Sequence, residues 1–298
     1  MKVLRADPDT DTVRALEELA TLEVFAGSPD ADRLTAEALI LGQALGVGSE
    51  QLAGLFLTRG IYLCTAGRRP EGVAFFREGA RLATQSGDNI IVGRALLNLS
   101  DGLASMDPAA AAEAARTAAT HLRRAGARDL LAAAITNLVQ ALLLLGDWDA
   151  AQAEFDQALG PDGLADDYLT TNLGWLMALR GDAATAGTLL ADLRDLRASE
   201  DLQDKSLISV VEAFTAAARR QPEDALSHAR GAGLCGRPGD KLRDLALGLA
   251  AGRARRLRAA GHRRYPRADR HARLLPARTC RRHAAGRARP GPSPAGRQ

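Results

Sequence analysis

The sequence has few aromatic residues and few cysteines, and both shortages narrow the class of protein. Aromatic residues make up 4% of the 298 residues, which suits helices that pack Leu against Ala and need few rings. The three cysteines, Cys64, Cys235 and Cys280, are odd in number and unmatched in spacing, so they predict no disulfide framework. Runs of β-branched residues are also nearly absent, while Ala and Leu dominate, so we expect an all-α fold.

Long hydrophobic runs are missing as well. The most apolar stretch, from Leu130 to Leu145, is interrupted by Asn137 and Gln140 and falls short of the ~18 uninterrupted apolar residues of a membrane span. Residues 1–8 carry no apolar signal segment, and acidic residues follow at once, which argues against secretion. We therefore expect a soluble, cytoplasmic chain without a membrane partner.

The motifs of enzymes and cofactor sites are absent or misplaced. Residues 231–236 match G-x-G-x-x-G, but a dinucleotide site needs a strand before this motif, and here a helical pattern precedes it. Lys241 follows Asp240 rather than the glycine of a P-loop. Cys280 and His283 fit no zinc-ligand spacing. Paired aspartates stand at turns and helix starts, where carboxylates cap amides. We expect no catalytic residue, no cofactor and no metal, and hence no enzyme.

What the chain does contain is a recurring two-helix unit. Residues 137–159 read NLVQALLLLGDWDAAQAEFDQAL, two amphipathic helical patterns joined by a Gly-Asp turn. Turns of this kind recur at intervals of 40, 39, 35 and 39 residues, at Gly67, Asp107, Gly146, Gly181 and Arg220. Such a period is typical of stacked helix pairs. The recurrence therefore predicts a repeat architecture.

Two further positions repeat with the turns. Five residues after each turn position stands a small residue that lets helices approach closely: Gly72, Ala112, Ala151, Ala186 and Ala225. Nine residues after it, three repeats carry a large residue that would fill the space between neighbours: Phe76, Phe155 and Leu190. The second and last repeats have Arg116 and Ala229 there, so the pattern is imperfect.

These residues resemble the tetratricopeptide repeat family. The runs that begin at Asn98, Asn137 and Asn172 match the first helix of its pattern, and residues 146–151 (GDWDAA) match its turn. The resemblance covers about residues 33–231, and its repeats are longer than is usual in that family. The Ala/Leu-rich style resembles the repeat arms of large bacterial nucleotide cyclases and ATP-dependent regulators. The resemblance implies a right-handed superhelical stack of antiparallel helix pairs (an α-solenoid), which we place at residues 9–231.

Charge separates this region from residues 232–298. The first 230 residues hold 21 Lys and Arg against 33 Asp and Glu, a net charge of −12, whereas residues 231–298 hold 18 against 3, a net charge of +15. Three interpretations of this Arg/Ala/Gly/Pro-rich tail are open: a tether for nucleic acid or acidic lipid, a disordered solvated tail, and an out-of-frame translation, since all four residue types have GC-rich codons. We favour the last. Nucleic acid is thus a possible partner only through the tail.

The first helix pair is predicted from Thr12 to Phe25 and from Arg33 to Leu45, with a turn at residues 28–30. No polar capping helix precedes it, although an exposed stack end usually needs one. We therefore expect either a piece of a larger protein or a chain that docks onto something at this end.

A surface is left to carry the function. In the family, the first helices of the pairs line the concave face, which accepts a peptide. The expected partner-binding residues there are Asn98, Asn137, Gln140, Asn172 and Trp175. For the asparagines, a polar contact between adjacent helices is the competing interpretation, and Trp175 suits an exposed anchor or a buried packing residue equally. We expect a non-catalytic scaffold that binds a protein partner, or, alternatively, a detached regulatory arm of a nucleotide cyclase or ATP-dependent transcriptional regulator.

Overall fold

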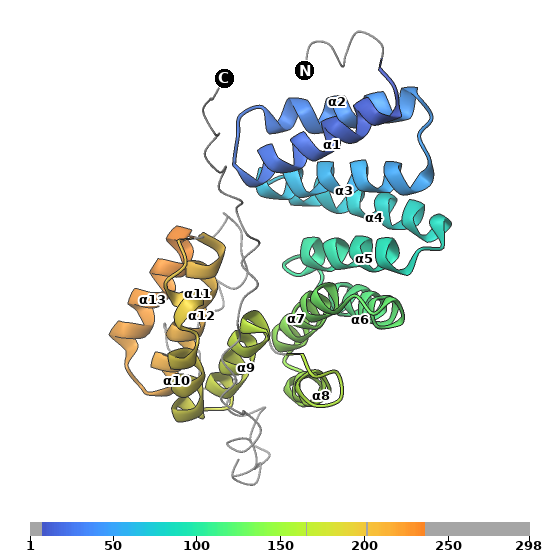
Figure 1. The fold of residues 1–298 in the computed structure, drawn as a ribbon. Helices are drawn as coiled ribbons and strands as arrows, with labels where there is room; N and C mark the ends of the chain where they lie inside the picture. Colours follow the sequence, from blue (N-terminus) through green and yellow to red (C-terminus); the bar gives the residue numbers. More distant parts are fainter. Residues whose placement is uncertain (1–7, 165, 201, 236–298) are drawn as a thin grey trace, which may run out of the picture. The chain divides into compact units, whose positions relative to one another are not determined.

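Helix pairs follow one another along the whole described chain (Figure 1). The computed structural model describes residues 8–164, 166–200 and 202–235, and within these all regular structure is helical. The first helix of each pair is called the A helix: α1 (Thr10–Phe25), α3 (Ser49–Thr65), α5 (Asn89–Leu103), α7 (Arg128–Leu145), α9 (Asp167–Leu179) and α12 (Leu202–Ala218). The second is the B helix: α2 (Ala31–Ala44), α4 (Arg69–Ser86), α6 (Pro108–Ala125), α8 (Trp148–Leu159), α10 (Ala183–Asp192) and α13 (Pro222–Cys235). A short helix, α11 (Arg194–Arg197), lies between α10 and α12.

The pairs pack in the order of the sequence. Each A helix after α1 packs against its own B helix, against the B helix before it and against the A helix before it, as α5 does with α6, α4 and α3. This is the contact pattern of a stack of helix pairs, in which each unit buries its apolar face on its neighbours. The predicted all-α architecture of paired helices is therefore confirmed. The C-terminal part of the predicted tail, residues 236–298, lies outside the described residues.

Backbone geometry at the turns explains the period that the sequence shows. Gly67, Gly146 and Gly181 each adopt a left-handed conformation between an A and a B helix, with φ of +80°, +78° and +85°. The amide that follows each of them donates to a carbonyl five residues earlier, as Asp147 does to Leu142 at 3.0 Å. This is the closure of a helix end by a left-handed residue, which glycine adopts without steric cost. Arg220 occupies the same place with φ of +64°.

The second repeat departs by one residue from the predicted register. Asp107 is the residue that caps α6, and its side chain accepts the amide of Ala110, so it corresponds to Asp147 rather than to Gly146. The small residue and the filling residue of this repeat are consequently Ala111 and Ala115, both buried. Arg116, which the sequence placed at the filling position, instead lies on the surface and pairs with Glu113 at 3.0 Å. The shift in register explains why an arginine stood at the filling position, although Ala115 is smaller than the Phe or Leu found there in three other repeats.

Other expectations can be compared with the helices directly. Cys64 is buried, as predicted. Helix α13 continues to Cys235, beyond the predicted domain end at residue 231, so most of the G-x-G-x-x-G match lies within a helix rather than in a loop after a strand. One described helix, α7, is long and apolar enough to cross a membrane by length and composition alone, and half of it is buried in the stack, as in the core helix of a soluble protein.

Candidate partner-binding surface

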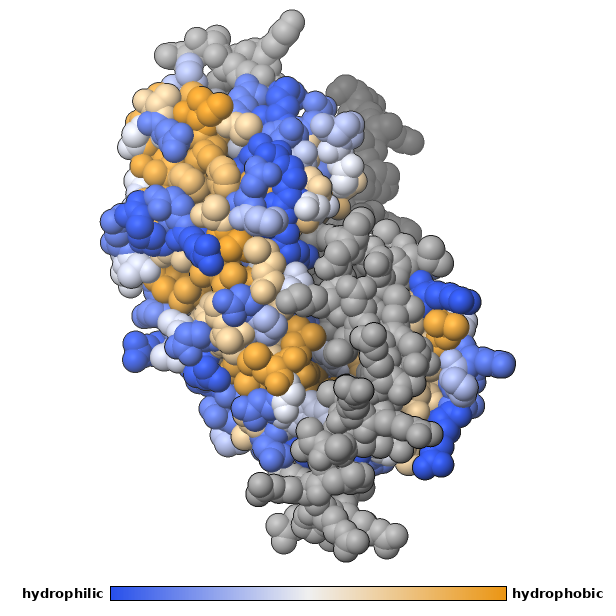
Figure 2. Space-filling view, turned by 180° about the vertical axis from the view of Figure 1, so that it is seen from behind, coloured by the Kyte–Doolittle hydropathy of each residue, from blue (hydrophilic) through white to orange (hydrophobic). Residues whose placement is uncertain are grey.

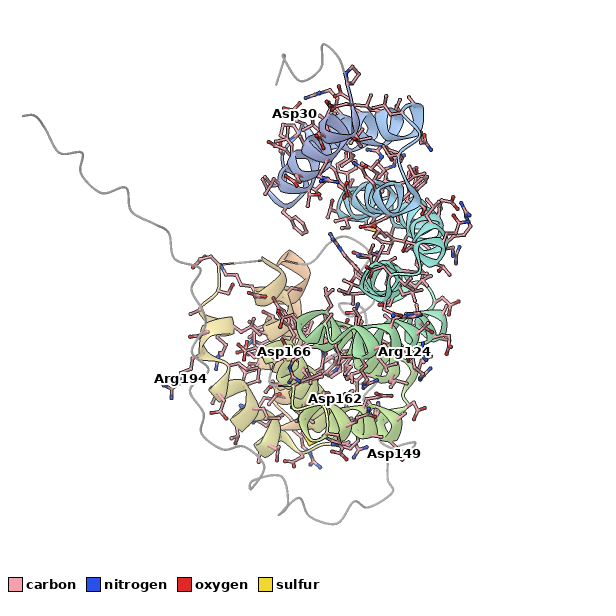
Figure 3. The ribbon with its side chains drawn as sticks, turned by 45° about the vertical axis from the view of Figure 1, so that its right-hand side comes forward. Asp30, Arg124, Asp149, Asp162, Asp166 and Arg194 are labelled. Atoms are coloured by element: carbon pink, nitrogen blue, oxygen red, sulfur yellow. The ribbon has the colours of Figure 1, made fainter. Side chains whose placement is uncertain are left out.

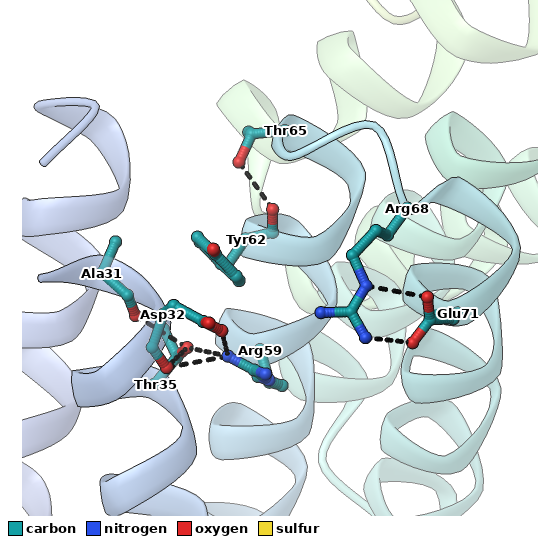
Figure 4. Close-up of polar contacts among 8 residues, drawn as sticks. All are labelled: Ala31, Asp32, Thr35, Arg59, Tyr62, Thr65, Arg68 and Glu71. Atoms are coloured by element: carbon teal, nitrogen blue, oxygen red, sulfur yellow. Dashed lines mark hydrogen bonds and ion pairs between the residues drawn. The ribbon is translucent and has the colours of Figure 1, made fainter. Parts of the chain in front are cut away.

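Polar side chains tie each pair to the next. In Figure 4, Arg59 of α3 reaches α2, where it donates to Asp32 Oδ1 at 2.6 Å and to Thr35 Oγ1 at 2.8 Å. Its guanidinium also lies 5.1 Å from the ring centre of Tyr62, in cation–π geometry. Because the Arg59 side chain is largely buried, these contacts fix the packing of the first two pairs rather than offering a free charge.

A second arginine link repeats further along the stack. Arg180, at the end of α9, donates to the carbonyl of Trp148 at 3.0 Å and to Asp149 at 2.9 Å. Arg219, at the end of α12, donates to the carbonyl of Ala183 at 3.3 Å, the first residue of the preceding B helix. Figure 3 labels Asp149 near the start of α8 and Asp166 before α9, where Asp166 accepts the amide of Leu169. The aspartates near the turns therefore take capping and pairing roles.

The three recurring asparagines have different surroundings, and one of them contacts the preceding A helix through its side chain. Asn137 Nδ2 lies 3.0 Å from Ser100 Oγ and 3.4 Å from the carbonyl of Leu97, both on α5. Asn98 donates to the carbonyl of Arg94 in its own helix at 2.9 Å. Asn172 is fully buried, and neither atom of its amide has a hydrogen-bond partner in the described part of the chain. The side chain of Asn137 thus makes a contact between helices, and the side chain of Asn98 makes a contact within its own helix.

Trp175 belongs to the interior. Its exposed fraction is zero, and its ring centre lies 5.4 Å from that of Phe214, which stands at the matching place on α12. Of the two interpretations left open by the sequence, packing is the one that the structure shows. Asn172 and Trp175 could meet a partner only if helices moved apart, so they contribute no surface in this conformation.

A partly exposed face of the A helices remains, and Gln140 lies on it. Residues seven apart share one face of a helix, since seven residues make close to two turns. By this spacing the face continues to Ala133 on α7, and the matching positions are Arg94 and Asp101 on α5 and Tyr168 on α9, where the residue seven further on is the buried Trp175. Arg94, Asp101 and Tyr168 are exposed, and Ala133 and Gln140 are half-buried. We call these five residues the A-helix face. Sequence reasoning found only Gln140, because the others share no residue type.

The A-helix face is chemically mixed. Tyr168 donates to Asp204 of α12 at 2.5 Å, which holds its ring in place. Arg94 also exerts a Coulombic attraction on Glu17 of α1, although burial dominates and raises the pKa of that carboxyl. Elsewhere the surface carries separate hydrophobic patches between charged residues, as Figure 2 shows. The face thus offers a cation, an amide and a ring from three different helices.

No group of three or more metal-binding side chains comes together among the described residues. His121 instead lies 2.8 Å from Asn89 Oδ1, and His228 lies 3.1 Å from Glu212. The fold and this surface define an all-α protein of stacked helix pairs. No protein-family model matches the chain, and comparison with curated proteins finds no relative.

Proposed function

We propose that the stack is a tetratricopeptide-like scaffold that binds a protein partner without catalysing a reaction. In this proposal the A helices line the concave side of a right-handed superhelix, and an extended segment of the partner lies across α5, α7 and α9. The observation that carries the proposal is the A-helix face, whose exposed or half-buried side chains stand at matching positions of three successively packed helices.

The chemistry of this face suits a peptide. Gln140 offers an amide that both donates and accepts, which matches a peptide backbone. Arg94 and Asp101 lie two turns apart on α5 and offer opposite charges. Repeat proteins use such extended surfaces, built from one or two side chains per unit, to bind their partners. The partner is therefore expected to be a protein segment, and no cofactor enters the proposal.

The test compares two double variants in an affinity capture read by quantitative mass spectrometry. Arg94→Ala with Gln140→Ala alters the A-helix face. Arg77→Ala with Gln157→Ala alters exposed residues of the B helices α4 and α8 and serves as the matched control. We expect the control to retain the specifically captured proteins and the A-helix variant to lose at least one of them tenfold or more. Equal recovery by both variants, with unchanged helicity, would contradict the proposal.

A further inference from the structure

One stripe of each A helix after α1 faces the preceding pair, and its positions can be counted back from the turn. Asn137 stands nine residues before its turn position and bonds to Ser100 on α5. Thr58 stands nine residues before Gly67, and its hydroxyl lies 3.4 Å from that of Thr21 on α1. In α5, aligned with the other A helices by placing Asn98 opposite Asn137, the position five residues before the turn is Gly102. A Cβ atom at Gly102 would lie 2.9 Å from the ring of Phe76 on the preceding B helix. We call the positions nine, twelve and five residues before the turn the rear stripe.

The rear stripe is covered in the later A helices. Twelve residues before the turn, every later A helix has a buried residue: Leu55, Ala95, Ala134, Leu169 and Ile208. Five residues before the turn, Gly102, Ala141, Leu176 and Thr215 are buried and Tyr62 is half-buried. These positions form the interface between successive pairs.

In α1 the same positions are exposed. Counting from Gly27, whose φ of +66° marks the turn, the rear stripe consists of Ala15, Glu18 and Leu22, and all three are exposed. Leu22 retains 68% of its surface and Phe25, one turn further on, retains 75%. Exposing large apolar side chains to water is unfavourable relative to burying them. Two of the three positions in the rear stripe of α1 thus carry apolar residues, as the buried interfaces do, but here they are exposed to solvent.

We propose that the rear stripe of α1 docks a helix pair of the same repeat type from a partner protein. The occupant follows from continuity, because each later rear stripe is covered by a preceding pair and α1 presents the same register. The partner would place small apolar residues opposite Ala15 and Leu22.

Charge specifies the partner further. Glu18 stands where α3, α5, α7 and α9 carry the uncharged residues Thr58, Asn98, Asn137 and Asn172, and Asp11 lies two turns before it on the same side. A carboxylate at an interface requires a cation or hydrogen-bond donors opposite it. The partner therefore carries Lys or Arg there. A second copy of this chain meeting α1 by the same stripe would bring carboxylates together, which disfavours it.

The experiment appends a helix pair to the full chain. Residues 128–164, the pair on which α9 packs with Leu176 at the position of Leu22, are joined to Met1 by a flexible glycine-serine linker. Hydrogen exchange of α1 amides, read by mass spectrometry, reports docking. We expect exchange to slow tenfold or more. Leu22→Glu in the fused chain should restore the fast rate, whereas Ile40→Glu, which alters an apolar residue that is 66% exposed but outside the stripe, should not.

A charge pair tests the register. Val139 of the appended pair corresponds to Ser100 in the contact with Asn137, so it is expected to face Glu18. Val139→Lys in the appended copy should protect α1 more than Val139→Glu, and equal protection would remove the basic partner from the proposal. Because one appended pair can fail to fold, the fusion is repeated with residues 89–127. Unchanged exchange in α1 with both pairs, or protection that survives Leu22→Glu, would overturn the proposal.

Discussion

Asn137 on α7 donates its amide to Ser100 Oγ on α5 at 3.0 Å, and the next repeat keeps the asparagine without its partner. Asn172 on α9 occupies the same position as Asn137, but Val139 stands where α5 has Ser100. A valine offers no hydroxyl, and both amide atoms of Asn172 are buried without a hydrogen bond in the described part of the chain. Asparagine at this position therefore stabilises the α5–α7 interface and destabilises the α7–α9 interface.

Replacing the two asparagines by leucine should change stability in opposite directions. Asn137→Leu removes a hydrogen bond between helices and should lower the free energy of unfolding by about 1 kcal/mol. Asn172→Leu removes an unsatisfied buried amide and should raise it by about 1 kcal/mol. Urea denaturation followed by circular dichroism measures both. Destabilisation by both variants alike would show that Asn172 has a partner, such as a bound water.

A hydroxyl placed opposite Asn172 should supply the missing bond. Val139→Ser loses apolar burial, so alone it is expected to destabilise the fold. That loss should be smaller by about 1 kcal/mol when Asn172 is present than when it is replaced by leucine. The double-mutant cycle isolates this coupling. A coupling energy of zero would mean that the two side chains do not meet.

Arg220 carries the one left-handed conformation of a non-glycine residue in the described ranges. A side chain in this conformation costs about 1 kcal/mol, and glycine relieves the cost. Arg220→Gly should therefore raise the free energy of unfolding by about 1 kcal/mol. The matched reverse change, Gly146→Arg at φ +78°, should lower it. The melting temperatures of the two variants and the unaltered chain measure both effects. A lower melting temperature for Arg220→Gly would contradict a steric cost at Arg220.

Glu17 should make stability depend on pH. Burial raises the pKa of its carboxyl above the ordinary value of 4.5, against the attraction of Arg94. The folded state therefore binds this proton more tightly than the unfolded state, so the contribution favours folding at low pH and is lost as the pH rises through the folded pKa. Glu17→Gln should stabilise the fold at pH 7 by about a few tenths of a kcal/mol, a value reduced for partial exposure. Denaturation of both chains at pH 4 and pH 7 measures the effect. An equal difference at both pH values would exclude titration of Glu17 as its cause.

Much of the architecture could be predicted from local signals. Glycine at Gly67, Gly146 and Gly181 marks left-handed turns, and the aspartate after two of them marks the cap of the next helix. The register of the second repeat could not be predicted, because Ala111 and Ala112 are the same residue type in an alanine run. Only the capping geometry of Asp107 separates them.

The surface was harder to predict than the fold. Recurrence of asparagine suggested a common binding role, whereas the structure uses that position where A helices meet. A repeated residue can report repeated packing as well as repeated recognition. The A-helix face is built from five different residue types, so no pattern of identity could reveal it. Its members are far apart in the sequence and stand on α5, α7 and α9, which pack in succession.

Contacts between helix neighbours also bear on how the chain reaches its native state. Each pair packs on the units beside it in sequence, so few contacts require distant segments to meet before local structure forms. Folding rates rise as the sequence separation of contacts falls. We therefore expect the chain to fold rapidly and to start at more than one helix pair. Folding is expected to start most often in the α7–α8–α9 region, where the largest buried cluster lies.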